Sequence, residues 1–340
     1  MKQPFSARRL LLPLVPLYRL ALVFRELRLR FGLEPVRRLR WPVISIGNLS
    51  AGGAGKTPLT IALAQALVRS GLYVDVLSRG YGRRGRLPAR VDPDGTAEEF
   101  GDEPLLIARE AGVPVYVAAE RYEAGLLVEA VRSADLPLGV HLLDDGFQHR
   151  QLHRDVNILL LSRQDWEDCL LPAGNLREPL AALRRATVVA IPATEEAPEL
   201  EAALRARGWQ GPIWRLRRRM EVPPVDEIRG PVVAFCGIAR PAQFFQGLES
   251  AGLRLAARIA FPDHHRYTAR DLDRLQAAAR RASAAAIFTT EKDRVRLGAR
   301  SASFPESLPL KTAHLRVEIE DESTALEFLA SALKQRSGSL

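Results

Sequence analysis

Short apolar runs alternate with stretches of helical periodicity over residues 41–210. Turn-forming residues bound most of the apolar runs, as is typical of buried strands in a sheet. Most of the stretches between them repeat their apolar residues every three to four positions, which predicts helices. Strands that alternate with helices usually form a doubly wound parallel sheet. We therefore predict an α/β fold, with strands at residues 43–46, 74–77, 113–117, 138–143, 156–161 and 187–191.

A second set of such runs follows a proline-containing stretch. This stretch, residues 211–226, contains Pro212, Pro223 and Pro224, and it is interpreted as a linker. The same alternation then predicts a smaller α/β domain over residues 227–340. Its predicted strands are residues 231–235, 253–261, 285–289 and 314–319, and its predicted helices are residues 241–250, 269–283 and 323 to about 335.

The first 40 residues are both basic and apolar. They contain ten Lys and Arg residues against Glu26 and Glu34, a net charge of 10 − 2 = +8. The longest uncharged run, residues 10–18, is nine residues long, whereas a membrane-spanning helix needs about 20. The pattern predicts a segment that lies in a membrane interface, with its Arg side chains among anionic lipids. The alternative is a helix that packs on the core of the protein and exposes its Arg side chains to solvent.

A glycine-rich turn lies between the first predicted strand and a helical pattern. The backbone N–H groups of such a turn bind phosphate, and the helix dipole favours the anion. Lys56 would reach the β- and γ-phosphates of a nucleotide, and the Thr57 hydroxyl would hold Mg²⁺. Ser50 stands where the strict P-loop pattern has Gly, although three glycines still let the backbone approach a phosphate. The turn predicts an NTPase-type P-loop made of Ser50, Ala51, Gly52, Gly53, Ala54, Gly55, Lys56 and Thr57.

Aspartates stand at two positions suited to phosphoryl transfer. Asp144 and Asp145 end the predicted strand at residues 138–143, where a P-loop protein has its second metal-holding element. A strand-end turn remains the alternative, because Asp-Asp-Gly also suits a turn. Asp102 precedes a predicted helix. It is either a helix cap or the general base that takes the proton of an attacking hydroxyl.

Further polar clusters lie near the ends of predicted strands. His264 and His265 are adjacent, so their side chains point apart and make poor joint metal ligands. Either they lie on the surface, or one of them pairs with a carboxylate across the cleft between the domains. The other clusters contain Glu178 and the run Glu291, Lys292 and Asp293. That run resembles base-recognition loops, with Glu inserted before Lys.

Composition narrows the choice of partner and compartment. The chain has 340 residues, 47% of them hydrophobic, which is enough for two domains with cores. Only two cysteines occur, Cys169 and Cys236, so no disulfide framework is predicted and a reducing compartment is favoured. The net charge of +9 points to an anionic partner, such as a nucleic acid, an anionic lipid surface or a phosphorylated substrate.

Taken together, these stretches resemble one family. The sequence contains, in order, S-x-G-G-x-G-K-T-P, S-R-G-Y-G-R, G-D-E-P, D-D-G-F-Q-H, N-L-R-E-P, G-I-A-x-P, F-P-D-H-H and T-T-E-K-D. This set resembles the tetraacyldisaccharide 4′-kinases of lipid A biosynthesis over about residues 8–300. The resemblance implies a lipid kinase that uses ATP and Mg²⁺ to phosphorylate the 4′-hydroxyl of a tetraacylated glucosamine disaccharide 1-phosphate, giving lipid IVA. It also implies a monomer that acts at the cytoplasmic face of the bacterial inner membrane, with no nucleic-acid partner.

The resemblance also implies roles for individual residues. Asp102 would be the base, His264 its partner and Lys56 the phosphate-binding cation. The metal region would contain Thr57, Asp144, Asp145 and Glu178, with His149 close to the phosphates. The nucleotide would contact the P-loop together with Glu291, Lys292 and Asp293. The acceptor would contact Asn48, Arg79, Arg83 and Arg121.

Features of the sequence argue against three other functions. A P-loop kinase or NTPase with a soluble substrate would not need the basic, apolar N-terminal segment. A partitioning or metal-insertion ATPase carries Lys immediately before the paired glycines, where this chain has Ala51. A membrane adaptor without enzymatic activity would have no use for Lys56 and the aspartates together.

Overall fold

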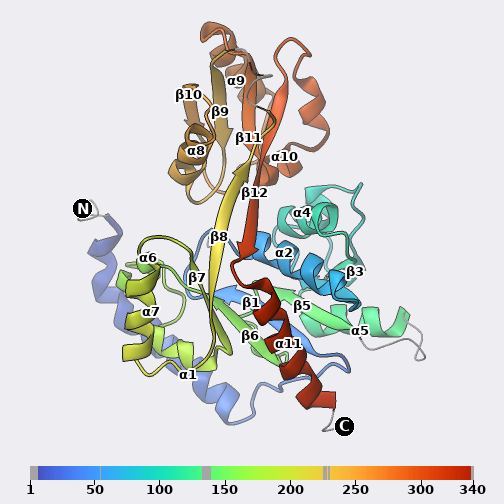
Figure 1. Ribbon diagram of the computed structural model, residues 1–340, viewed down its shortest axis with the longest axis vertical. Coiled ribbons are helices and arrows are strands. Elements are labelled where there is room, and N and C mark those ends of the chain that lie inside the picture. Colours follow the sequence, from blue (N-terminus) through green and yellow to red (C-terminus); the bar gives the residue numbers. More distant parts are fainter. Residues whose placement is uncertain (1–6, 54, 132–138, 225–227, 229, 338–340) are drawn as a thin grey trace.

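A computed structural model of the protein describes residues 7–53, 55–131, 139–224, 228 and 230–337. Figure 1 shows two lobes joined by two long neighbouring strands, β8 (Ile213–Glu221) and β12 (Leu310–Ile319). Twelve strands form one sheet, in the order β10-β9-β11-β12-β8-β7-β6-β1-β5-β2-β4-β3. Both lobes therefore share one hydrogen-bonded framework.

The first lobe is built on parallel strands. From β7 to β4 every neighbouring pair is parallel, and only the short edge strand β3 runs antiparallel to its neighbour. Five of these strands agree with the sequence prediction to within a few residues, and β4 forms the last part of the predicted 113–117 run. The strands are β1 (Val43–Asn48), β2 (Val74–Ser78), β3 (Ala89–Arg90), β4 (Val115–Val117), β5 (Val140–Asp144), β6 (Val156–Leu160) and β7 (Val188–Pro192).

Helices cover both faces of this sheet. One hydrophobic cluster joins the sheet to α2 (Lys56–Arg69), α4 (Asp102–Glu110) and α11 (Glu322–Ser337). Two clusters on the other face involve α1 (Val15–Arg30), α5 (Arg121–Val131), η2 (Leu180–Arg185) and α7 (Ala197–Ala206). The predicted doubly wound α/β fold is thus confirmed. The remaining helices of this lobe are η1 (Ala7–Leu14), α3 (Ala97–Phe100) and α6 (Arg163–Glu167).

The second lobe repeats this layering on a smaller scale. Its strands β9 (Val232–Cys236), β10 (Leu255–Ala260) and β11 (Ala286–Thr290) are parallel. Phe244 and Leu248 of α8 (Pro241–Ser250) pack on one face, and Leu272 and Leu275 of α9 (Ala269–Arg281) pack on the other. Two further helices, α10 (Glu291–Leu297) and η4 (Gly298–Ser303), complete the lobe.

The sequence predicts a linker at residues 211–226, and for most of this stretch the prediction is wrong. Its residues 213–221 form β8, which pairs in parallel with β7 and antiparallel with β12. Buried and exposed side chains alternate along it from Trp214, as they do in a strand with one covered face. The prolines lie before and after the strand, because a proline inside it would remove a ladder hydrogen bond.

The end of the chain also differs from the predicted domain 227–340. Helix α11 does not pack in the second lobe. Its Ala325, Leu329 and Leu333 belong to the same hydrophobic cluster as Leu59 and Leu63 of α2. The chain therefore returns along β12 to complete the core of the first lobe.

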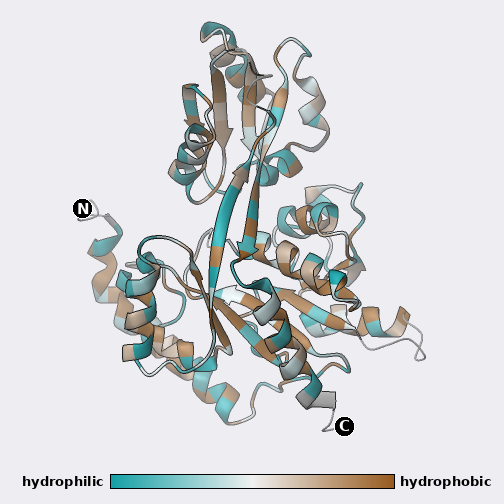
Figure 2. Cartoon of the chain, in the orientation of Figure 1, coloured by the Kyte–Doolittle hydropathy of each residue, from teal (hydrophilic) through white to brown (hydrophobic). Residues whose placement is uncertain are grey.

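Helix α1 packs on the first lobe with some of its apolar side chains and exposes others. Val15, Tyr18 and Leu22 pack against a core cluster of the first lobe, whereas Leu17, Leu20 and Phe24 are 67%, 64% and 63% exposed. Figure 2 shows hydrophobic and hydrophilic residues interleaved along this helix. Within the described part of the chain, no helix has the length and apolar character that crossing a membrane requires. Membrane association of α1 remains a prediction.

Candidate active site

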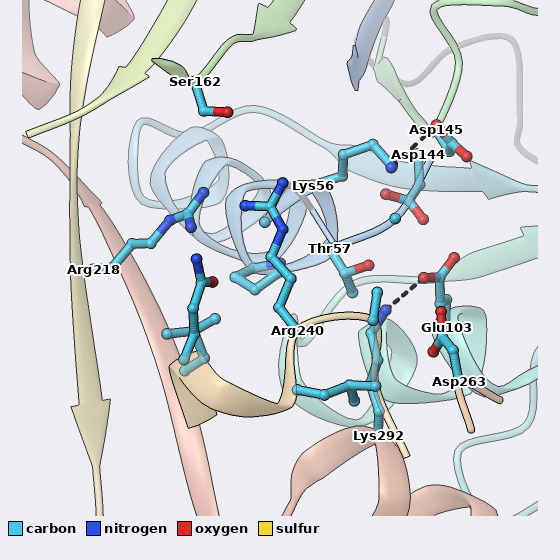
Figure 3. A pocket seen from close by; sticks show the side chains of 18 of the residues that line it. Lys56, Thr57, Glu103, Asp144, Asp145, Ser162, Arg218, Arg240, Asp263 and Lys292 are labelled. Atoms are coloured by element: carbon cyan, nitrogen blue, oxygen red, sulfur yellow. Dashed lines mark hydrogen bonds and ion pairs between the residues drawn. The ribbon is translucent and has the colours of Figure 1, made fainter. Parts of the chain in front are cut away.

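A cleft of about 1440 Å³ lies between the lobes, at the carboxyl ends of the first-lobe strands. The P-loop forms one of its walls, and residues of α8, α10 and the β10–α9 loop reach it from the second lobe. Figure 3 shows side chains from both lobes pointing into this space. Ligands of doubly wound sheets bind at this end of the strands, so the cleft is the candidate active site.

Side chains of the P-loop are held by hydrogen bonds to Asn48 of β1 and by an ion pair with Asp145. Gly55 has φ 89°, a left-handed conformation that favours glycine. Lys56 Nζ donates to Asn48 Oδ1 at 3.0 Å and lies 3.5 Å from Asp145 Oδ1. The Asn48 amide in turn donates to Ser50 Oγ at 3.0 Å. Ala54 lies outside the described residues.

Oxygen-bearing side chains gather beside Lys56. Figure 3 places Thr57, Glu103, Asp144 and Asp145 around one part of the cleft. Burial raises the pKa of Asp144, and the negative charges of Glu103 and Asp145 raise it further. Mg²⁺ takes oxygen ligands and would relieve this mutual repulsion. The side chains present therefore fit the predicted ion.

Two cationic side chains lie near the Asp145 carboxylate, and the residue has a positive φ. Its Oδ2 lies 3.1 Å from Arg177 Nη1. Burial raises its pKa, but the charges of Lys56 and Arg177 outweigh this effect and hold the pKa below its ordinary value. Asp145 also adopts φ 47°, a conformation that is uncommon outside glycine and is concentrated at functional sites. Asp145 is thus held as a carboxylate that faces the P-loop lysine.

Asp102 and His264 meet across the cleft. Asp102 begins α4 of the first lobe, and His264 lies in the β10–α9 loop of the second. His264 Nδ1 is 3.1 Å from Asp102 Oδ2, and His264 has φ 59°. The structure thus brings together the two residues that the sequence analysis assigned to one role.

A third residue, Arg296 of α10, shares this contact. Its Nε donates to Asp102 Oδ2 at 2.7 Å. Burial raises the pKa of Asp102, but the hydrogen bond from His264 and the charge of Arg296 hold it well below its usual range. The hydrogen bond to Asp102 raises the pKa of His264. The carboxylate is therefore ionised and oriented, as a proton acceptor must be.

Basic side chains line the cleft near His149. Arg121 is 7% exposed, and within the described residues its Nε has no hydrogen-bond partner. Burial, together with the charge of Arg79, lowers the pKa of Arg121 to about 10. Burial, with the charges of Arg121 and Arg154, lowers the pKa of His149 to about 3. Buried positive charge of this kind favours an anionic ligand.

A family model described as "Tetraacyldisaccharide-1-P 4'-kinase" matches residues 7–334. The chain belongs to this family. A tetraacyldisaccharide 4'-kinase of Koribacter versatilis is 39% identical to it over 334 residues, which cover 96% of this chain and 99% of the relative. One of Anaeromyxobacter dehalogenans is 43% identical over 290 residues, covering 78% of this chain and 75% of the relative.

The solved structures agree. The chain resembles the crystal structure of LpxK from Aquifex aeolicus in complex with ATP, with a TM-score of 0.73 and 32% sequence identity. The match covers 96% of this chain and the whole of the other. The resemblance to tetraacyldisaccharide 4'-kinases and the expected phosphotransferase class are thereby confirmed.

Some residues that the family resemblance had assigned to ligands have other neighbours. Glu178 pairs with Arg185 and lies 3.7 Å from Arg25 of α1, and it is absent from the described lining of the cleft. This position does not favour Glu178 as a metal ligand. Asn48 is fully buried beneath Lys56, so it supports the P-loop and does not face an acceptor.

Arg83 and Asp293, which were also assigned to ligands, form hydrogen bonds within the protein instead. Arg83 donates to the backbone oxygens of Arg86 and Leu87, so it folds its own loop. Asp293 is fully buried and accepts hydrogen bonds from Tyr267, Thr290 and the Gly237 backbone. Its neighbours Glu291 and Lys292 do line the cleft. Of the predicted T-T-E-K-D loop, only these two charged side chains are positioned to meet a ligand.

Sequence reasoning missed Arg296, Arg218 and Arg240. Arg296 lies three residues after Asp293 on the same helix, and the only local signal was that spacing from an acidic residue. Arg218 lies on β8, which had been interpreted as a linker. Arg240 lies within the G-I-A-x-P motif, to which no role had been given.

Proposed function

We propose that the protein transfers the γ-phosphoryl group of ATP to the 4'-hydroxyl of a tetraacylated glucosamine disaccharide 1-phosphate. One observation carries this proposal. A P-loop lysine and a pair of strand-end aspartates face the same cleft as an Asp–His pair contributed by both lobes. Phosphoryl transfer requires such charge neutralisation and positioning.

The P-loop side supplies the positive charge. The backbone N–H groups of the turn and Lys56 bind the phosphates and stabilise the charge that develops on them. Thr57, Asp144 and Asp145 would hold Mg²⁺, which when bound neutralises phosphate charge. Arg177 and Lys56 keep Asp145 ionised for this role.

The Asp102 side supplies the base. Asp102 accepts the proton of the sugar hydroxyl as that hydroxyl attacks phosphorus. His264 orients the carboxylate through its hydrogen bond, and Arg296 fixes the same oxygen from α10. Because His264 and Arg296 belong to the second lobe, the base is positioned only when the two lobes are together.

The acceptor and the membrane are proposed to lie on the basic side of the cleft. Arg79 and Arg121 line it and would bind the 1-phosphate of the lipid. The exposed apolar side chains of α1, together with its Arg residues, would hold the protein at the cytoplasmic face of the inner membrane. The enzyme would act there as a monomer, without a nucleic-acid partner.

The test is a transfer assay with purified protein, ATP, Mg²⁺ and a tetraacylated disaccharide 1-phosphate in mixed micelles. Phosphorylated lipid should form, and Lys56→Ala should lower its rate by about 10²–10³-fold or more, because charge stabilisation at the phosphate is lost. A deacylated disaccharide 1-phosphate is the matched soluble acceptor. If it were phosphorylated as well as the lipid, the alternative of a P-loop kinase for a soluble substrate would be favoured.

A further inference from the structure

Two arginines from outside the first lobe reach the P-loop. Arg218 lies on β8, and Arg240 immediately precedes α8 of the second lobe. Both line the cleft, and Figure 3 shows their side chains extending toward the start of α2, on the opposite side of Lys56 from Asp144 and Asp145. The reaction as described so far makes no use of either residue.

The contact with the phosphate-binding turn is close. A β-carbon placed on Gly55 would lie 2.9 Å from Arg218 Nη2, so the guanidinium rests directly against the turn. A β-carbon on Gly52 would lie 3.5 Å from Cβ of Ala239, the neighbour of Arg240. The G-I-A-x-P motif of the second lobe therefore lies close to the P-loop.

The charges around these arginines suit an anion. Burial lowers the pKa of Arg218, and the like charge of Arg240 lowers it further, while the charge of Asp165 opposes this. The Asp165 carboxylate already accepts hydrogen bonds from the backbone N and the hydroxyl of Ser162. A phosphate group can accept paired hydrogen bonds from a guanidinium, and it would relieve the repulsion between the arginines.

We propose that Arg218 and Arg240 form a phosphate clamp, which holds the non-bridging oxygens of the nucleotide polyphosphate against Gly55 from the side opposite the metal-binding carboxylates. The proposal deepens the proposed function and rests on ATP as the phosphoryl donor. Arg240 belongs to the second lobe and Arg218 to a strand that joins the lobes. A polyphosphate held by both therefore also draws the second lobe onto the P-loop.

The test compares nucleotide binding by isothermal titration calorimetry in the absence of lipid. Arg218→Ala and Arg240→Ala should each weaken ATP binding about ten- to a hundredfold, as expected for loss of a hydrogen bond between charged groups. Binding of adenosine, which has no phosphate, should be unchanged. Arg218→Lys should recover part of the ATP affinity, because it retains the charge but not the paired hydrogen bonds.

Arg217→Ala is the matched control. Arg217 is the neighbour of Arg218 on β8 and pairs with Glu320, so its loss should leave ATP affinity unchanged. Unchanged ATP affinity in Arg218→Ala and Arg240→Ala would overturn the clamp. So would equal weakening of ATP and adenosine binding, which would indicate a general loss of site structure.

The test of the clamp is distinct from the test of the proposed function. The titrations need no acceptor, so a protein that bound ATP through both arginines but failed to phosphorylate the lipid would refute the acceptor assignment alone. If Arg218→Ala did not fold, the decision would rest on Arg218→Lys and Arg240→Ala, and full ATP affinity in both would refute the clamp.

Discussion

One carboxylate oxygen of Asp102 is contacted by side chains from two elements of the second lobe. His264 and Arg296 both contact Oδ2, at 3.1 Å and 2.7 Å, while Oδ1 accepts the Glu103 backbone N–H at 3.0 Å. The arrangement makes Asp102 well oriented but a weaker base than a free carboxylate, since its pKa is lowered. Precise positioning is then the larger contribution that this residue makes to the reaction.

Removing the base tests whether the two residues act as a unit. Asp102→Ala should lower kcat by about 10²–10⁴-fold with little change in ATP affinity, and His264→Ala should lower it less. Groups that act together are non-additive, so the double variant should be scarcely slower than Asp102→Ala. Values of kcat at saturating substrate for both single variants and the double variant decide the matter. Losses that multiply would mean that the residues act independently.

Arg296 should control the pH dependence of the reaction. Its positive charge lowers the pKa of Asp102, so Arg296→Ala should raise that pKa and move the acid limb of the kcat–pH profile to higher pH. Arg296→Lys keeps the charge and should move the limb less. Profiles of kcat for the three proteins test this expectation. An acid limb at the same pH in all three would show that Arg296 does not act on the base.

The residue scale also shows what a sequence can and cannot predict. The P-loop was predictable because strand, turn and lysine are contiguous, so local chemistry specifies the whole site. Asp102 and His264 were paired only through the family resemblance, since 162 residues separate them. The Arg296 contact depends on how α10 faces α4, and no local pattern in the chain encodes that packing.

Among the elements of the first lobe, a buried ion network ties two strands to a helix. His141 of β5 lies 2.8 Å from Asp75 of β2 and 3.4 Å from Glu129 of α5. His141 and Asp75 are fully buried. Burial lowers the pKa of His141, but the charges and hydrogen bonds of the two carboxylates raise it to about 9. The sheet therefore contains a protonated histidine at neutral pH.

This network should make the free energy of unfolding depend on pH. The pKa of His141 is higher in the folded state than the ordinary 6.5, so its stabilisation is fully present below pH 6.5 and is lost as pH rises through about 9. The loss is on the order of 3 kcal/mol. Urea unfolding at pH 6, 7.5 and 9 should show this loss in the free energy of unfolding for the native protein. The His141→Gln variant should not show it. Parallel pH dependence in both proteins would assign the effect to other groups.

Helix α1 exposes apolar side chains on the side that faces away from the first lobe. Leu20→Gln with Phe24→Gln should weaken binding to anionic vesicles, since both side chains point away from the core. Added salt should weaken binding of the native protein, because about 1 kcal/mol per basic residue is screened. Deletion of residues 1–30 should also weaken binding to anionic vesicles. Vesicle flotation measures the binding in each case.

The matched control for α1 is Leu87→Gln, in the loop before β3. Leu87 is 81% exposed, so its substitution removes exposed apolar surface away from α1 and should leave flotation unchanged. Unaltered flotation of the α1 variant would favour the alternative that the helix serves only to pack on the first lobe.

At the scale of the whole molecule, ion pairs hold the two lobes together. Lys292 of α10 lies 2.5 Å from Glu103 of α4. Arg316 of β12 bridges Glu110 of α4 and Glu291 of α10, at 3.0 Å and 3.3 Å. Glu110, Glu291 and His314 have a spacing that a metal ion could use, but the Arg316 guanidinium already balances both carboxylates. The cluster is better explained as a contact between the lobes.

Loss of this bridge should open the molecule. Arg316→Met removes the cation shared by Glu110 and Glu291, so repulsion between the two carboxylates should separate the lobes. We expect a larger radius of gyration by small-angle X-ray scattering, and a similar trend in the native protein at high salt. Arg258→Met is the control, because Arg258 pairs with Glu249 inside the second lobe. Equal radii for the native protein and both variants would contradict the bridge.

The pairing of β8 with β12 has a consequence for how such a molecule can arise. Glu221 and His314 stand opposite each other in the ladder, so the chain departs from the first lobe and rejoins it at one point. Topologically, the residues between them are an insertion in a hairpin, and a short turn could replace them without changing any neighbouring strand. A self-contained P-loop domain could thus gain a second lobe by insertion at one point, while α11, beyond the insertion, kept its place in the core of the first lobe.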